Sequence, residues 1–163
     1  MQSIDTSGLE RFDKVLDRLL MDMPKERETL HREIGDILKA DVDAAMISAG
    51  LKSRKGKIRS WQKTHIGSRG GYAAVRPQEG ALPANSCGEE YAFGHITNSI
   101  VSGHDIRKPE SSSKHVYKKG RIKVGRVRGF PFYKIARTTA DAKVIHLIEK
   151  YVDSVADRLE GKA

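Results

Sequence analysis

The stretch GRIKVGRVRGFPFYKIAR, residues 120–137, contains the change from a strand pattern to a helix pattern on which the fold depends. From residue 121 to residue 128, cations alternate with apolar residues, which predicts a β-strand with its cations toward water. Gly125 interrupts the alternation and accommodates a bulge. The apolar side chains expected on the packed side of this strand are Ile122, Val124 and Val127.

A long closing helix is predicted after this strand. Pro131 has no backbone N–H to donate within a sheet, so we expect it to end the strand and the helix to run from about Tyr133 to the C-terminus. Apolar residues recur there every three or four positions, as they do on one face of a helix. They are Ile135, Ala136, Val144, Leu147, Ile148, Tyr151, Val152, Val155 and Leu159.

Two helices are predicted at the N-terminal end. The apolar positions of the first are 9, 12, 16, 19, 20 and 23, and Thr6 or Ser7 can cap its start. Pro24 is tolerated at the first position of a helix but not in its interior, so it is expected to open a second helix that ends near Gly50. The stripe of this second helix is Leu30, Ile34, Ile37, Leu38, Ala45 and Met46.

The middle of the chain favours short strands and loops. Residues 60–77, SWQKTHIGSRGGYAAVRP, predict two strands joined by a glycine turn, and residues 77–90 predict a loop. Residues 90–107, EYAFGHITNSIVSGHDIR, predict a strand and a turn, and residues 108–114 a polar loop. The fold class is therefore α+β: two N-terminal helices, a small, mostly antiparallel β-sheet and a long C-terminal helix.

The length of 163 residues suits one domain with one core, 1–163. We divide it into a helical part (1–50), a basic β-rich part (51–132) and the C-terminal helix (133–163). The net charge of +9 belongs to the middle: residues 51–137 hold 19 Lys and Arg against 5 Asp and Glu. Such a field attracts a polyanion or the acidic surface of a partner subunit, although a merely solvated face has the same composition.

Catalytic, metal and cofactor motifs are not found in the sequence. Cys87 has no second cysteine to pair with, and an intracellular protein without disulfides is expected. His95, His104 and His115 are spaced too widely for a local metal motif. No phosphate-binding glycine motif occurs, and no apolar run reaches the length of about 20 residues that spans a membrane. We therefore expect no catalytic residues, no metal, no cofactor and no membrane partner.

The order of features resembles the minor tail or head-tail joining proteins of long-tailed bacteriophages and prophages, often called tail-completion proteins. A helical region broken at MDMPKE (21–26) precedes GHITNSIVSGHDIR (94–107) and the stretch at 120–137. The sharpest similarities are Gly103-His104 followed by Arg107, and the Gly/Pro/aromatic turn before the last helix. Residues 51–76 do not follow the family pattern, and residues 108–119 are longer and more basic than in a minimal member.

The resemblance implies a structural protein for virion assembly, not an enzyme, that forms a homo-oligomeric ring. It would bind other phage tail or connector proteins and could contact DNA in the channel. It would be found in the host cytoplasm during assembly and then in the virion, at the tail or the head-tail junction. The turn Gly129-Phe130-Pro131-Phe132 would set the angle between strand and helix, with Phe130 or Phe132 buried. The alternative is that the two rings are ordinary core residues with no such role. The partner- or DNA-facing cations would be Arg121, Lys123, Arg126 and Arg128.

A small basic nucleic-acid-binding protein is the alternative function. Its cations would neutralise phosphates, and aromatic side chains near them would stack on bases. The aromatic residues close to the basic segments are Trp61, Tyr72 and Tyr117.

Overall fold

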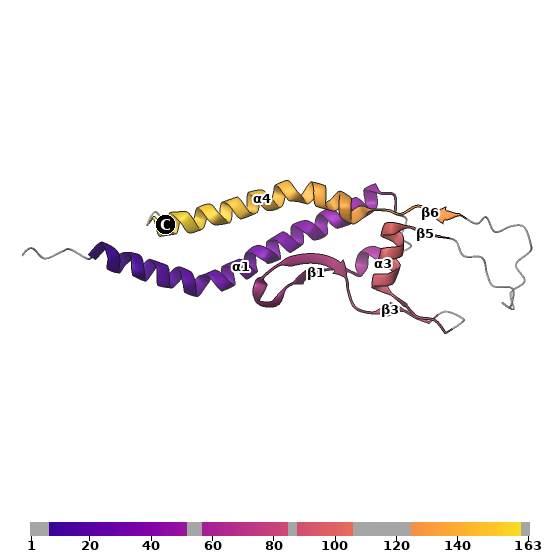
Figure 1. Cartoon of the computed structure of the whole chain (residues 1–163), viewed down its shortest axis with the longest axis horizontal. Coiled ribbons are helices and arrows are strands. Elements are labelled where there is room, and N and C mark those ends of the chain that lie inside the picture. The colour runs from indigo at the N-terminus through magenta and orange to yellow at the C-terminus, as the bar shows by residue number, and fades with distance from the viewer. Residues whose placement is uncertain (1–6, 52–56, 85–87, 106–124, 161–163) are drawn as a thin grey trace, which may run out of the picture.

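Two long antiparallel helices form the frame of the protein. The computed structural model describes residues 7–51, 57–84, 88–105 and 125–160. Helices α1 (Ser7–Ser48) and α4 (Phe132–Leu159) run side by side (Figure 1). Ion pairs join Asp41 to Lys143 and Glu26 to Arg158, each at 2.5 Å. Because the earlier residue of α1 meets the later residue of α4, the two helices point in opposite directions.

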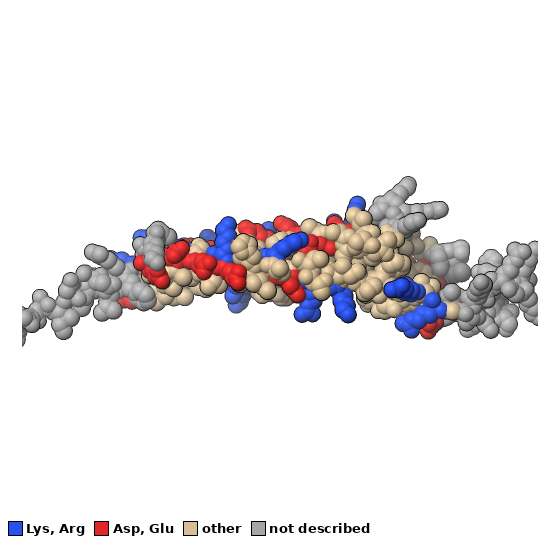
Figure 2. Space-filling view, turned by 90° about the horizontal axis from the view of Figure 1, so that it is seen from above, with Lys and Arg blue, Asp and Glu red and all other residues tan. Residues whose placement is uncertain are grey.

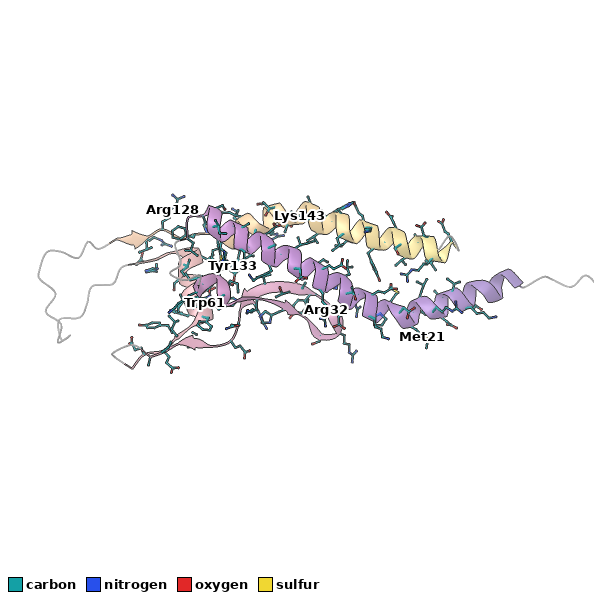
Figure 3. The ribbon with its side chains drawn as sticks, turned by 180° about the vertical axis from the view of Figure 1, so that it is seen from behind. Met21, Arg32, Trp61, Arg128, Tyr133 and Lys143 are labelled. Atoms are coloured by element: carbon teal, nitrogen blue, oxygen red, sulfur yellow. The ribbon has the colours of Figure 1, made fainter. Side chains whose placement is uncertain are left out.

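Helix α1 shows that the prediction of two N-terminal helices was wrong. The helix continues through Pro24, which lies in its interior. Proline removes one backbone hydrogen bond and bends a helix, and Figure 3 shows α1 changing direction close to the labelled Met21. Leu19 before the proline and Ile34 after it are both buried. Burial on both sides of Pro24 stabilises one bent helix over two separate ones.

A β-hairpin covers one side of α1, as residues 60–77 predicted. Strand β1 (Gln62–Ile66) pairs antiparallel with β2 (Ala73–Pro77), and the 3₁₀ turn η2 (Ser68–Gly70) joins them. A Cβ at Gly35 of α1 would overlap the methyl group of Thr64, whose hydroxyl donates to the Gly35 carbonyl at 3.3 Å. Gly35 thus allows the hairpin to approach the helix closely.

The described part of the segment 90–107, which ends at residue 105, is mainly a helix, so the strand predicted there was wrong. Helix α3 (Phe93–Ser102) follows β4 (Tyr91–Ala92), which pairs with β3 (Ala81–Leu82) inside the predicted loop. Phe93 and Thr97 are one turn apart, and Phe93 stacks on Trp61 with ring centroids 4.5 Å apart. Packing against Trp61 thus outweighs the β-propensity of this segment. A short helix, α2 (Lys57–Ser60), precedes the hairpin.

The strand predicted from 121 to 128 is described only from residue 125 onward. There β6 (Arg126–Val127) pairs antiparallel with β5 (His104–Asp105). Val127 is exposed, which contradicts its predicted place on a packed side, and Ile122 and Val124 lie outside the described residues. The described strands therefore form three separate two-stranded pairings instead of one small sheet.

The core lies where the C-terminal half of α1 meets the start of α4. The predicted closing helix is confirmed and begins at Phe132, one residue earlier than expected. Phe132 is fully buried and packs in one cluster with Val42, Ala45, Met46 and Ala136. Further along α4 the predicted stripe is only partly covered, because Ile148, Val152 and Leu159 are exposed.

A buried polar network connects the hairpin, α3 and α4 beside this core. The Thr97 hydroxyl accepts hydrogen bonds from Trp61 Nε1 and Gln62 Nε2, both at 3.2 Å, and donates to the Phe93 carbonyl at 2.8 Å. Tyr133 donates to Gln62 Oε1 at 2.5 Å. Gln62 and Thr97 are fully buried, so each partner replaces water that they lost on folding.

Replacing Thr97 by Val lowers the free energy of unfolding by about 1–3 kcal/mol, since buried donors on Trp61 and Gln62 lose their acceptor. Urea denaturation followed by tryptophan fluorescence measures this loss. Thr138→Val is the matched control, because the Thr138 hydroxyl is exposed and bonds only to its own helix, at the Ile135 carbonyl. Equal stability of the two variants would contradict a stabilising role for the network.

Candidate functional site at the basic end

We call the basic head the described residues of 57–84, 88–105 and 125–140. The hairpin, α2, α3, the short strands and the start of α4 make it up, and Figure 1 shows most of them below and beside the C-terminal half of α1. It contains nine Lys and Arg against four Asp and Glu. The remaining described length of α1 and α4 is richer in acids, so the two ends of the molecule differ in charge.

The two segments that carry the family resemblance meet in the basic head. Gly103 has a φ of +74°, and a Cβ there would overlap the Val127 carbonyl. A Cβ at Gly129 would likewise overlap the Val101 carbonyl. The Phe130 N–H donates to the Ile100 carbonyl at 2.8 Å. Two glycines that are 26 positions apart in the chain thus allow two backbones to touch.

The turn 129–132 leads directly from this contact into α4. The Pro131 carbonyl accepts from the N–H groups of Lys134 and Ile135, at 3.0 and 3.2 Å, so the turn starts the helix. Phe130 is half-buried against the core, whereas Phe132 is fully buried and contacts the ring of Tyr133. The buried ring of Phe132 therefore anchors the start of α4 in the core directly after the turn.

Two of the cations that were predicted to face a partner or DNA are among the described residues, and both lie on the surface near this turn. Arg126 and Arg128 are exposed, and Arg126 Nη2 donates to the Ser102 carbonyl at 3.3 Å. His104 pairs with Val127 across β5 and β6 and is also exposed. The predicted residues that lie outside the described part of the chain are Arg107, Arg121 and Lys123.

The hairpin adds a pair of cations that the sequence analysis did not single out. Lys63 and Arg76 are direct cross-strand partners, and both are exposed. Like charges placed opposite each other destabilise a hairpin unless an anion lies between them. No acidic residue occurs from position 51 to 78. The predicted turn at SRGG (68–71) is centred where this register requires, so the pair could have been read from the predicted hairpin.

The aromatic side chains differ in what they can contact. Trp61 is buried against Phe93, so stacking of a base on Trp61, as proposed from the sequence, is excluded. Tyr72 is 56% exposed at the end of the hairpin, and Tyr117 lies outside the described residues. Burial raises the pKa of Tyr133 to about 12, so this hydroxyl stays protonated and keeps donating to Gln62.

No cluster suited to a metal ion occurs in the part of the chain that the structure describes. His95 and His104 are exposed, while Cys87 and His115 are outside that part. Among the same residues, no helix combines the length and apolar character needed to cross a bilayer. The arrangement that remains is a cationic, partly aromatic surface, whose chemistry suits an anionic partner.

No protein-family model, curated protein or solved structure significantly matches this chain.

Proposed function

We propose that this chain is a structural protein of a tailed bacteriophage or prophage that acts in virion assembly as an oligomer. Its place would be the tail end or the head-tail junction, as a minor tail or tail-completion protein, and it would not be an enzyme. It would bind copies of itself and neighbouring tail or connector proteins, in the host cytoplasm first and then in the virion.

The observation that carries this proposal is the contact between the two resembling segments. Gly103 and Gly129 touch through their backbones, and the second leads through the aromatic turn into α4. The contact gives the two resembling segments one shared structural role. The exposed cations Arg126 and Arg128 lie beside the contact, where a partner subunit or DNA in a channel could meet them.

Deletion of the gene from its phage or prophage tests the proposal directly. Negative-stain electron microscopy of the lysate should show filled heads together with separate or aberrant tails. The wild-type gene supplied from a plasmid should restore complete particles. Normal, infectious particles without the gene would overturn the assembly function.

Nucleic-acid binding is the second candidate function, and the Lys63–Arg76 pair favours it. These two exposed cations face each other across β1 and β2 with no acidic residue in the hairpin. Phosphates on both sides of the pair would relieve its repulsion. The register places both side chains on one surface, away from the Thr64 side that contacts α1.

The variant Lys63→Glu/Arg76→Glu should bind DNA at least about tenfold more weakly than wild type if this candidate is correct. Fluorescence anisotropy with a labelled duplex at low salt measures the affinity, and a salt series should show a shallower slope for the variant. Lys134→Glu/Arg137→Glu makes the same change in net charge at other exposed positions. If both variants bind alike, the hairpin is not the DNA site.

A further inference from the structure

The end of the helix pair opposite the head exposes an apolar stripe. We call this end the arm: residues 13–33 of α1 with residues 141–160 of α4, which Figure 3 shows on the side away from the labelled Trp61. On α4 the stripe repeats at three- and four-residue spacing, as helices that pack on a partner do. The stripe residues of α4 are exposed to these extents: Ile145 54%, Ile148 40%, Val152 56% and Leu159 39%. On α1, Leu16 is 37% exposed and Leu20 is 60% exposed.

The two parts of the stripe open toward the side of the helix pair where the hairpin lies. Leu20 precedes Arg27 by two turns, and Arg27 donates to the Arg69 carbonyl at the hairpin tip at 3.0 Å. On α4, Ile148 lies about 100° around the helix from Leu147, which faces α1 across a groove of about 500 Å³. The polar groove residues Lys150 and Ser154 are turned the other way. The stripe is therefore separate from that groove.

Acids, and no cations, flank five of the six stripe residues at helical spacing. For Leu16, Leu20, Ile145, Ile148 and Val152, no position three or four residues away is Lys or Arg. Four of those positions are acidic and exposed, namely Asp13, Asp17, Asp141 and Glu149. The whole arm holds 11 acids and 8 bases, and Figure 2 shows acidic side chains in a run along it. An apolar surface with an acidic rim fits a partner that carries cations beside apolar groups.

The hairpin of the same protein has these properties. Lys63 and Arg76 are exposed on its outer surface, and neither forms an ion pair with a described residue. The exposed ring of Tyr72 follows at the turn. By contrast, two arms placed face to face would bring acidic rims together, which costs free energy. Charge therefore favours contact between the arm of one copy and the hairpin of another.

We propose that the arm of one copy docks on the outer face of the hairpin of a second copy. The stripe would cover Tyr72 and its surroundings, with Asp13 and Asp17 near Lys63 and Arg76. Such a contact is heterologous, so it repeats from copy to copy and forms a ring if the rotation closes. This inference deepens, and rests on, the oligomeric part of the proposed function.

Two variants with complementary defects test the contact. Leu20→Glu/Val152→Glu disables the arm at two positions that are more than half exposed, and Lys63→Glu/Arg76→Glu disables the hairpin. Size-exclusion chromatography with light scattering should show wild-type oligomers and at least about tenfold weaker association of either variant. An equal mixture should form a dimer and nothing larger, because only one intact arm and one intact hairpin remain to pair.

A charge exchange gives a second readout. A chain that carries Asp13→Lys/Asp17→Lys together with Lys63→Glu/Arg76→Glu should regain association that each half alone loses. Lys134→Glu/Arg137→Glu should associate as wild type does, and circular dichroism should show unchanged helix in every variant. These measurements use purified protein and test only the contact between arm and hairpin. The deletion experiment tests the assembly function, so either proposal can be contradicted without the other.

Three results would overturn the proposal. The first is a wild-type protein that stays monomeric at concentrations of roughly 100 μM, well above the dissociation constants of ordinary assemblies. The second is a hairpin variant that still associates, which would indicate arm-to-arm pairing. The third is a hairpin variant that loses only DNA binding, which would assign Lys63 and Arg76 to nucleic acid.

Discussion

Replacing Phe132 by Ala lowers the free energy of unfolding by about 3–5 kcal/mol, the largest effect expected of a single substitution in this protein. The ring is fully buried and packs against Val42 and Met46 of α1. Alanine leaves a cavity at the start of α4, and the transfer free energy of the removed atoms is lost as well. Urea denaturation monitored by circular dichroism measures the difference.

Two variants show whether the Phe132 effect comes from its burial. Phe132→Leu keeps most of the volume and should cost clearly less than Phe132→Ala. Ile135→Ala removes a large apolar side chain from the same helix, but that side chain is 38% exposed and should cost less too. If all three variants were equally stable, the aromatic turn would not anchor α4 to α1.

Replacing Gly103 by Ala should lower the free energy of unfolding by about 2–4 kcal/mol. With φ +74° and ψ 172°, Gly103 has a backbone conformation that essentially only glycine adopts, which costs an L-residue about 1–3 kcal/mol, and the new Cβ would also overlap the Val127 carbonyl, which as backbone cannot turn aside. Both costs fall on the contact between β5 and β6. Urea denaturation gives the loss, and hydrogen exchange should show faster exchange of the Phe130 amide, which donates to Ile100.

The matched control for Gly103 is Gly50→Ala. Gly50 has a similar φ of +71°, but a Cβ there meets nothing within 4 Å. This variant carries the cost of a positive φ without the overlap and should lose only about 1–2 kcal/mol. A Gly103 variant no less stable than the Gly50 variant would mean that the close approach at Val127 is not needed.

The spacing of apolar residues correctly predicted the elements whose packing in the fold follows that spacing. The hairpin was predicted because β1 and β2 flank a glycine turn, and α4 because Pro131 precedes a long helical pattern. The α+β class followed from these elements. In the same way, the alternation at 126–128 predicted exposed cations at Arg126 and Arg128.

The errors arose where long-range packing decides between local alternatives. Pro24 was expected to divide α1, but Leu19 and Ile34 are buried on either side of it, and local sequence rules do not include that burial. From local sequence alone, Phe93 and Thr97 fit a strand as well as a helix. The helix is favoured only by their contacts with Trp61, which is distant in the sequence. The Lys63–Arg76 pair was missed because it follows from the register of β1 against β2, and therefore from the centre of the turn, and not from composition.

The bend at Pro24 has a mechanical consequence. Residues 7–24 of α1 form a lever about 26 Å long, and the proline removes the hydrogen bond that would stiffen its base. A change of about 10° at that point moves the N-terminal end of the lever by roughly 5 Å, whereas the core around Phe132 stays fixed. In the oligomer proposed above, a tip that bends at Pro24 would let each copy meet its neighbours at slightly different angles.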